Sequence, residues 1–201
     1  MSRIPILTPE GGFVKGEEIN TLRHLLTHTA GFGYPNATYK LHPAFDAGRW
    51  DYEDFPRQFE SGTRFLYGTN TDWVGKLVEQ VSGMTLEVYF KKNIFEPLGI
   101  KNTHFNVPEN AKKRIASMGN RGEDGRSKLR EIDGDEVSPN RYPVKKITKF
   151  SGGDGLFSTP SDYTKILQCM LNYGVVDGRR ILEKKTVETM VENQIGEISL
   201  D

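Results

Sequence analysis

A tyrosine placed where a turn meets a helix is the residue of this chain best suited to proton transfer. Within the stretch 61–79, Tyr67 stands just before Thr69, Asn70 and Asp72, so its hydroxyl would be presented among other hydrogen-bonding groups. A phenol with an ordinary pKa near 10 is a poor base at neutral pH unless an ammonium group favours its phenolate. The alternative is a tyrosine that packs at the helix start with its hydroxyl satisfied locally. These residues alone favour that packing role.

Two histidines four positions apart form the second candidate group. His24 and His28 could share one helical face, and such pairs can bind zinc. The glutamate of a His-Glu-x-x-His motif is missing, because Leu25 follows His24, and no acidic third ligand is near in sequence. A buried or capping role for His28 is therefore favoured, and we expect neither a metal ion nor a cofactor.

An aromatic, irregular segment lies between Tyr34 and Phe59, where Tyr34 and Trp50 are candidates to contact a substrate. Aromatic loops of this kind can line a cleft. A loop held together by its own rings explains the same composition equally well.

The glycine-rich turn from Ser151 to Gly155 needs glycine dihedrals or a close approach of backbone, and Gly153 is a further substrate-contact candidate. The turn resembles a phosphate loop only superficially. No Gly-Lys-Ser/Thr follows it, which argues against nucleotide binding.

Apolar periodicity places these groups on or beside helices. Asn20 is the expected N-cap of a helix that runs through Thr29 with Leu22, Leu25 and Leu26 facing inward. The helix after Tyr67 is expected to bury the apolar positions of its stripe, which are Trp73, Val74, Leu77, Val78 and Val81.

Further helices are expected later in the chain. Thr85 should cap one that buries Leu86, Phe90 and Ile94. Thr159 as N-cap and Pro160 at the first position predict another, with a stripe of Tyr163, Ile166, Leu167, Met170 and Leu171. A last helix around 184–193 should bury Val187, Met190 and Val191. The turn 122–125 predicts a hairpin between strands at 114–118 and 128–132.

Composition limits the class of protein. The 201 residues carry 27 Lys+Arg and 27 Asp+Glu, so no net field favours nucleic acid or an anionic membrane surface. The single cysteine excludes a disulfide framework. No apolar run is long enough for a signal peptide or a membrane span, so we expect a soluble, cytoplasmic chain. A hydrophobic fraction of only 36%, with many aromatic residues, suits one lobe of a larger protein.

Several ordered blocks resemble the serine β-lactamase and penicillin-binding-protein-like family, especially its esterase and acyltransferase branch. They are Ile19–Gly31 with its Thr-His-Thr-Ala-Gly ending, Phe65–Gly75 around Tyr67, Val78–Gly83, Ile94–Thr103 and Gly152–Tyr163. Together they span roughly residues 19–194. Each block alone is weak, and the ordered set is specific.

The resemblance implies acyl transfer through a serine ester, with the serine in a Ser-x-x-Lys motif and a tyrosine that relays its proton. By resemblance Tyr67 takes the relay role. Asn70, Trp50, Tyr34 and Gly153 are the candidates for substrate contact. The implied substrates are small-molecule acyl esters, thioesters or amides, with no role for nucleic acid or a membrane.

Departures from the family pattern limit this inference. No serine has lysine three positions later; Ser127 is followed by Arg130 and Ser138 by Arg141. A Lys-Thr-Gly or His-x-Gly strand after the last helix is also missing. Many β-lactamases have Asn two positions after the tyrosine, where this chain has Thr69.

The spacing from Tyr67 to Asp72 and Gly75 fits the esterase-like pattern Tyr-Ser-x-x-x-Asp-x-x-Gly, with Gly68 in place of Ser. That fit favours ester or thioester chemistry over β-lactam hydrolysis.

We therefore expect a mainly α chain with a small β-hairpin (α+β), which is the helical lobe of the β-lactamase/transpeptidase-like fold without most of its antiparallel sheet. Residues 1–201 would form a single partial domain of a truncated family member, inactive alone because the nucleophile segment is missing. The alternatives are a non-catalytic small-molecule-binding or regulatory module and a fragment complemented by a partner chain. Apolar surface at Leu22, Leu25 and Ile166 would favour self-association.

Overall fold

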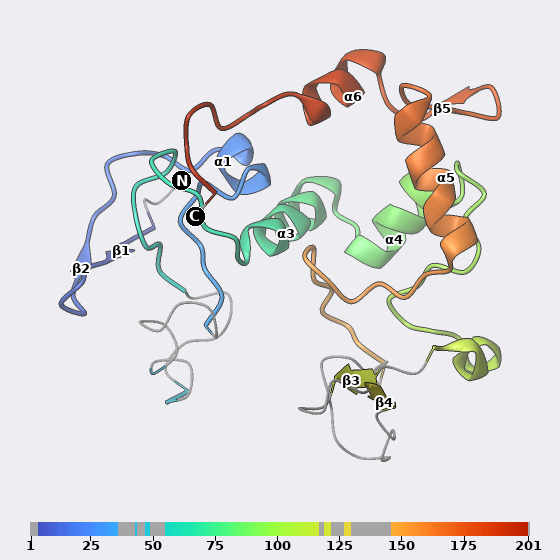
Figure 1. Cartoon of the computed structure of the whole chain (residues 1–201), viewed down its shortest axis with the longest axis horizontal. Coiled ribbons are helices and arrows are strands. Elements are labelled where there is room, and N and C mark those ends of the chain that lie inside the picture. The colour runs from blue at the N-terminus through green and yellow to red at the C-terminus, as the bar shows by residue number, and fades with distance from the viewer. Residues whose placement is uncertain are drawn as a thin grey trace. The chain divides into compact units, whose positions relative to one another are not determined.

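The computed structural model describes residues 4–35, 43, 47–48, 55–116, 119–121, 127–129 and 146–200 (Figure 1). The chain forms two compact units. Unit 1 contains Met1–Leu86, Ser151–Asp154 and Lys184–Asp201, and unit 2 contains Glu87–Phe150 and Gly155–Glu183. Whether residues 1–201 form a single partial domain, as the sequence predicts, is not tested by this division into two units. Within the described part, no helix is both long and apolar enough to cross a membrane.

The described part of unit 1 contains one short hairpin and three helices. β1 (Ile6–Leu7) pairs antiparallel with β2 (Phe13–Val14). The helices are α1 (Leu22–Leu26), α3 (Asn70–Ser82) and α6 (Lys184–Val191). α3 ends at Gly83, which has the left-handed φ of 67° that glycine adopts readily at a helix C-terminus.

A buried arginine fastens the first strand of unit 1 to the segment before Ser61. Arg57 is completely buried; its Nε and Nη2 donate to the Ile4 carbonyl at 3.1 and 3.0 Å, and its Nη1 donates to Ser61 Oγ at 2.9 Å. Glu60 supplies a carboxylate 3.5 Å from the guanidinium. Leu7 and Phe55 make a small apolar cluster beside these contacts.

Unit 2 is built around one apolar cluster. α4 (Leu86–Phe90) continues into the π-helix η1 (Lys91–Phe95), and η2 (Glu109–Arg114) is a 3-10 helix. α5 (Pro160–Leu171) precedes the hairpin of β5 (Val175–Val176) and β6 (Arg179–Arg180). The buried members of the cluster are Phe95, Leu98, Ile100 and Cys169.

The predicted fold class is confirmed, since helices dominate and the described strands form only two-stranded antiparallel pairs. The hairpin of residues 114–132 is present, but its strands are β3 (Gly119–Arg121) and β4 (Ser127–Leu129). Its first strand starts later than predicted, because Arg114 still belongs to η2.

Several helix details were wrong. The N-cap of α1 is Thr21 rather than Asn20, and the helix ends at Leu26 rather than Thr29. A hydroxyl at Thr21 forms a capping box with His24, which Asn20 could not form from one position earlier.

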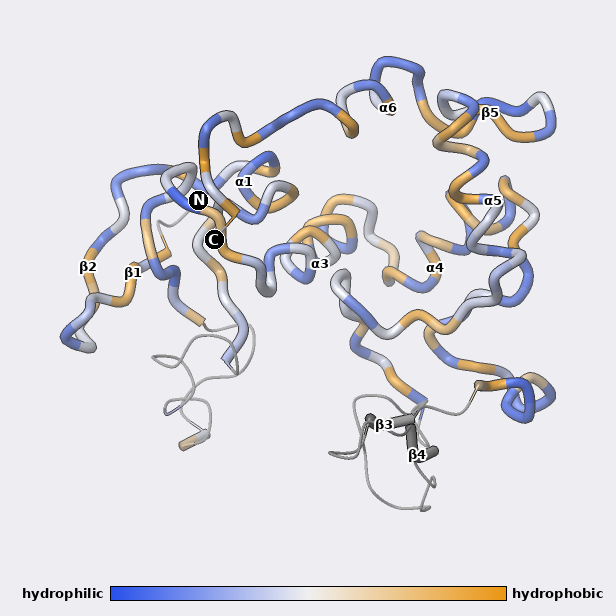
Figure 2. The backbone as a smooth tube through the Cα atoms, viewed as in Figure 1, coloured by the Kyte–Doolittle hydropathy of each residue, from blue (hydrophilic) through white to orange (hydrophobic). Residues whose placement is uncertain are grey.

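The apolar stripes were predicted as more buried than they are. Residues expected inside but largely exposed are Leu22, Leu26, Val81, Tyr163, Leu167, Leu171, Met190 and Val191. Leu86 and Val187 are buried as predicted. Figure 2 shows apolar and polar residues alternating along α3 and α5, so both helices are amphipathic.

Candidate active site

Three segments of unit 1 lie side by side and fix the position of Tyr67. The Gln58 amide donates to Gly31 O and the Gly62 amide to Thr29 O, both at 2.8 Å. On the other side, the Leu66 amide donates to His28 O at 2.8 Å. The Thr-His-Thr-Ala-Gly segment is therefore hydrogen-bonded both to the stretch 58–62 and to Leu66. Tyr67 directly follows Leu66.

Gly68 makes this close packing sterically feasible. A Cβ at position 68 would overlap the carbonyl oxygen of Phe32 and lie 2.6 Å from the Cα of Gly33. Only glycine lets the two backbones approach this closely without a shift. This close approach explains why position 68 is glycine, where the esterase-like pattern has serine.

The Tyr67 side chain stands at the open edge of this arrangement. It is 61% exposed, and its ring packs on the His28 ring with centroids 4.6 Å apart and a 35° angle between the planes. The Tyr34 ring lies 5.9 Å away at 59°. No hydrogen bond links the Tyr67 hydroxyl to another described residue. The ring is held on its faces while the hydroxyl stays available to a reacting group.

His28 does not share a helical face with His24, so the premise of the zinc alternative was wrong. α1 ends at Leu26, and His28 has a left-handed φ of 55°. His24 instead faces the N-cap, where its Nδ1 accepts the Thr21 amide at 3.4 Å. Among the described residues, no three potential ligand side chains gather around a metal-sized space.

The protonation state of His28 follows from its contact with Asn70. The Asn70 nitrogen lies 3.0 Å from Phe32 O and 3.3 Å from Leu66 O, which identifies it as the donor end of the amide. The same nitrogen lies 3.1 Å from His28 Nδ1; because an amide nitrogen only donates, a hydrogen bond between them has Nδ1 as the acceptor, with the proton of the neutral ring on Nε2. Burial lowers the pKa of His28, in agreement with a neutral ring.

Asn70 itself is fully buried, and its amide joins the segment 28–32 to the end of the segment before α3. Its Oδ1 has no hydrogen-bond partner within the described part of the chain. Contact between Asn70 and a substrate stays a prediction, and the enclosed position of the amide weighs against it.

The glycine-rich turn packs on the first turn of α3. Ser151 Oγ donates to Asp72 Oδ1 and accepts the amides of Gly153 and Asp154, each at 3.0 Å. A Cβ at Gly153 would lie 2.8 Å from Asp72 Oδ2, so this position also requires a small residue. With its amide engaged by Ser151, Gly153 remains only a predicted substrate contact.

The structure thus brings Tyr67, Asn70 and Tyr34 together, and places Gly153 in the loop beside the same helix start. Trp50 lies outside the described residues. Sequence reasoning missed His28 as the neighbour of Tyr67 and Ser151 as the partner of Asp72. The two threonines flanking His28 favour a helix end before it, and that signal could have separated His28 from α1.

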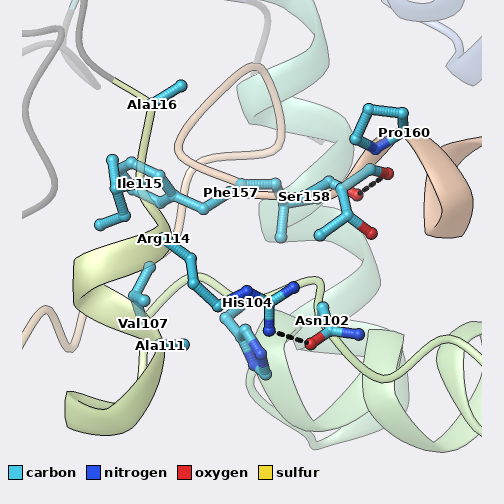
Figure 3. A pocket seen from close by; sticks show the side chains of 12 residues that line it. Asn102, His104, Val107, Ala111, Arg114, Ile115, Ala116, Phe157, Ser158 and Pro160 are labelled. Atoms are coloured by element: carbon cyan, nitrogen blue, oxygen red, sulfur yellow. Dashed lines mark hydrogen bonds between the residues drawn. The ribbon is translucent and has the colours of Figure 1, made fainter.

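A cavity of about 400 Å³ in unit 2 is a different feature (Figure 3). Its polar lining is engaged internally: Arg114 Nη1 donates to Asn102 Oδ1 at 3.0 Å, and Ser158 Oγ lies 2.8 Å from Thr103 Oγ1. None of the predicted site residues lines it.

Comparison with known proteins identifies the family. The profile described as Beta-lactamase matches residues 12–199. The chain belongs to the β-lactamase family. The monacolin J acid methylbutanoyltransferase of Aspergillus terreus is 32% identical in an alignment of 193 residues that covers 86% of this chain and 42% of that protein. The lovastatin esterase of Penicillium rubens is 31% identical, over 88% of this chain and 45% of its own length.

Solved structures of the β-lactamase family superpose on this chain. A mutant of simvastatin synthase from Aspergillus terreus matches with a TM-score of 0.80 at 32% identity, covering 95% of this chain and 47% of the synthase. EstCE1, a hydrolase with promiscuous acyltransferase activity, matches at 23% identity with a TM-score of 0.69, which shows the common fold. The chain spans about half the length of the relatives it matches.

Proposed function

We propose that this chain supplies the tyrosine-bearing part of a serine acyltransferase or esterase site, with Tyr67 as the proton relay. The observation that carries the proposal is the geometry of Tyr67, whose ring is packed by His28 and Tyr34 while its hydroxyl is open. Membership of the β-lactamase family supports it, as do relatives named for acyl transfer and ester hydrolysis. The substrate class is a small-molecule acyl ester or thioester.

The proton path can be written for the complete site. Tyr67 starts as the phenolate; a serine hydroxyl attacks the acyl carbonyl carbon and gives its proton to the phenolate oxygen of Tyr67. The bond from that carbon to the leaving oxygen or sulfur then breaks, and the proton passes from Tyr67 to the leaving group. The acceptor, water or an alcohol, reverses these transfers and frees the serine.

The nucleophile is not one of this chain's serines, because no Ser-x-x-Lys occurs in it. The 201 residues alone should therefore form no acyl-enzyme. Incubation with a fluorophosphonate probe followed by intact mass spectrometry should leave the chain unlabelled. Stoichiometric labelling of one serine would contradict this division of the site.

The relay role is tested in a chimera. Residues 12–199 replace the matching part of the Aspergillus terreus methylbutanoyltransferase, which then contributes the remainder of its own fold. The chimera should hydrolyse p-nitrophenyl butyrate, and Tyr67→Phe should lower kcat about 100-fold, because general acid–base catalysis by one group contributes at least that much.

Tyr163→Phe is the matched control, since this exposed tyrosine lies on α5 and outside the proposed site. It should leave kcat unchanged. A folded, active chimera in which Tyr67→Phe keeps full activity would overturn the proposal.

A further inference from the structure

We propose that His28 is the positioning residue for Tyr67: its neutral ring, oriented by Asn70, fixes the direction of the phenol. This inference rests on the proposed function and adds a residue to that site. The contacts that carry it are the 4.6 Å separation of the two rings and the 3.1 Å distance from Asn70 Nδ2 to His28 Nδ1.

Two independent contacts hold His28 in place. Its backbone carbonyl accepts the Leu66 amide at 2.8 Å, so His28 is tied to the residue before Tyr67. Its ring is tied through Asn70 to the first turn of α3, the helix that follows Tyr67. The ring is thus connected to the chain on both sides of the tyrosine whose face it covers.

The residue type also fits this task. A rotating phenol hydroxyl can relay a proton only if the ring plane is fixed, because misplacement of a catalytic group by about 1 Å can cost 100-fold in rate. Phe65 also contacts the His28 ring, with ring centroids 5.9 Å apart. A small neutral ring with one acceptor nitrogen packs against both Phe65 and Tyr67 and still accepts from the Asn70 amide.

The left-handed backbone of His28 limits the residues that can replace it. With φ at 55°, position 28 favours Asn, Asp or His among the non-glycine residues. His28→Asn therefore keeps the backbone while removing the ring, and it serves as the main test variant. His28→Phe restores a ring without the acceptor nitrogen.

The first test uses the chain itself and needs no activity. In a ¹⁵N-histidine-labelled sample, the His28 Nδ1 resonance should be of the unprotonated type and Nε2 of the protonated type. In His28→Asn, the Tyr67 ring protons should lose the ring-current shift that His28 causes, while the Tyr163 ring protons should not move. A protonated Nδ1, or Tyr67 shifts that do not change, would overturn the proposal.

The second test is a double-mutant cycle in the chimera. His28→Asn should lower kcat about tenfold with KM nearly unchanged, because the substrate is bound but the relay is misdirected. In the Tyr67→Phe background it should have no further effect. His28→Phe should recover part of the lost kcat.

The two proposals fail in distinguishable ways. If Tyr67→Phe abolishes activity and His28→Asn does not lower it, only the positioning role is overturned. Equal losses from His28→Asn with and without the Tyr67 hydroxyl would indicate a general structural role and also overturn it. If Tyr67→Phe has no effect, the relay function falls and the positioning role falls with it.

Discussion

The N-terminal turns of α3 and α5 have similar sequences but differ in how their polar side chains are hydrogen-bonded. Tyr67–Trp73 and Phe157–Tyr163 both follow the pattern aromatic, small, Thr, any residue, Ser or Thr, Asp, aromatic. In each case the threonine is the N-cap and the aspartate is the third helical residue. The similarity of sequence makes the contrast in hydrogen bonding informative.

The α5 start satisfies its polar groups. Thr159 is extended and its Oγ1 accepts the Asp162 amide at 3.3 Å, as an N-cap should. Asp162, which is almost fully buried, accepts the amides of Lys101 at 3.1 Å and Asn102 at 2.5 Å. Lys165 lies 3.4 Å from the same carboxylate. This start stabilises unit 2.

The α3 start leaves several polar groups unsatisfied. Thr69 has φ −71° and ψ 14°, and its side chain caps nothing. Buried side-chain atoms without a partner among the described residues include Thr69 Oγ1, Asn70 Oδ1 and Asp72 Oδ2. Natural proteins rarely leave such atoms unpaired away from functional sites. The comparison shows that the α3 start, unlike the α5 start, is not stabilised by a side-chain hydrogen bond from its own N-cap.

The largest effect should come from exchanging the small residues before the two caps. Gly68→Ser should reduce the free energy of unfolding by about 3 kcal/mol, because its Cβ would overlap the Phe32 carbonyl. Ser158→Gly should cost only about 1 kcal/mol, since it removes one hydrogen bond to Thr103. Urea unfolding measures both, and a tolerated Gly68→Ser would show that the two starts are less different than the structure indicates.

The second largest difference in stability is expected between variants of the two aspartates, Asp162 and Asp72. Asp162→Ala should cost about 2 kcal/mol, because two backbone amides lose a charged acceptor. Asp72→Ala should cost less, about 1 kcal/mol, since among the described residues Asp72 has a hydrogen-bond partner at Oδ1 only, which is Ser151. Equal costs in urea unfolding would contradict the contrast.

Acid should weaken the Asp162 contribution. Burial raises the pKa of Asp162, but the Asn102 and Lys101 amides and the Lys165 ammonium lower it by more, so the net shift is downward. A carboxyl with a lowered folded pKa stabilises the fold above its unfolded pKa of about 3.9 and loses that contribution as pH falls through the folded value. The stability gap between the native chain and Asp162→Asn should be constant above pH 5 and shrink below about pH 4. A gap that grows in acid would be inconsistent with this shift.

The caps should show the smallest difference. Thr159→Val should cost about 1 kcal/mol, the usual value for loss of an N-cap hydrogen bond. Thr69→Val should be close to neutral or slightly stabilising, because it replaces a buried hydroxyl without a partner by a methyl group of similar size. Thermal unfolding of the two variants measures this difference. Equal losses of stability would show that the Thr69 hydroxyl also caps its helix.

Local patterns predicted local structure well. Thr159 and Pro160 predicted the start of α5, and Thr85 with its following apolar residues predicted the helix at Leu86. Tyr67 was identified as the relay candidate from its motif. These predictions depend on residues within one or two helical turns of one another.

Contacts between distant segments could not be predicted. Arg57 is the largest fully buried side chain described, yet nothing near it in sequence indicates that Ile4 and Ser61 enclose it. The meeting of His28 with Tyr67 and of Ser151 with Asp72 likewise depends on segments far apart in the chain. The exposure of Val81 and Leu171 depends on which elements pack beside them, and periodicity does not determine that.

The contact between two glycines has a consequence for the order of events during synthesis. A Cβ at Gly75 would lie 2.9 Å from the Cα of Gly152, so the backbone of α3 is in direct contact with the backbone of the glycine-rich turn. Ser151 follows Asp72 by 79 positions, and most of the intervening residues belong to unit 2. On the ribosome, the helix beside Tyr67 therefore waits for its last neighbour until much of unit 2 has emerged. The packing of unit 1 is incomplete during that interval, and this is when chaperones would bind the nascent chain.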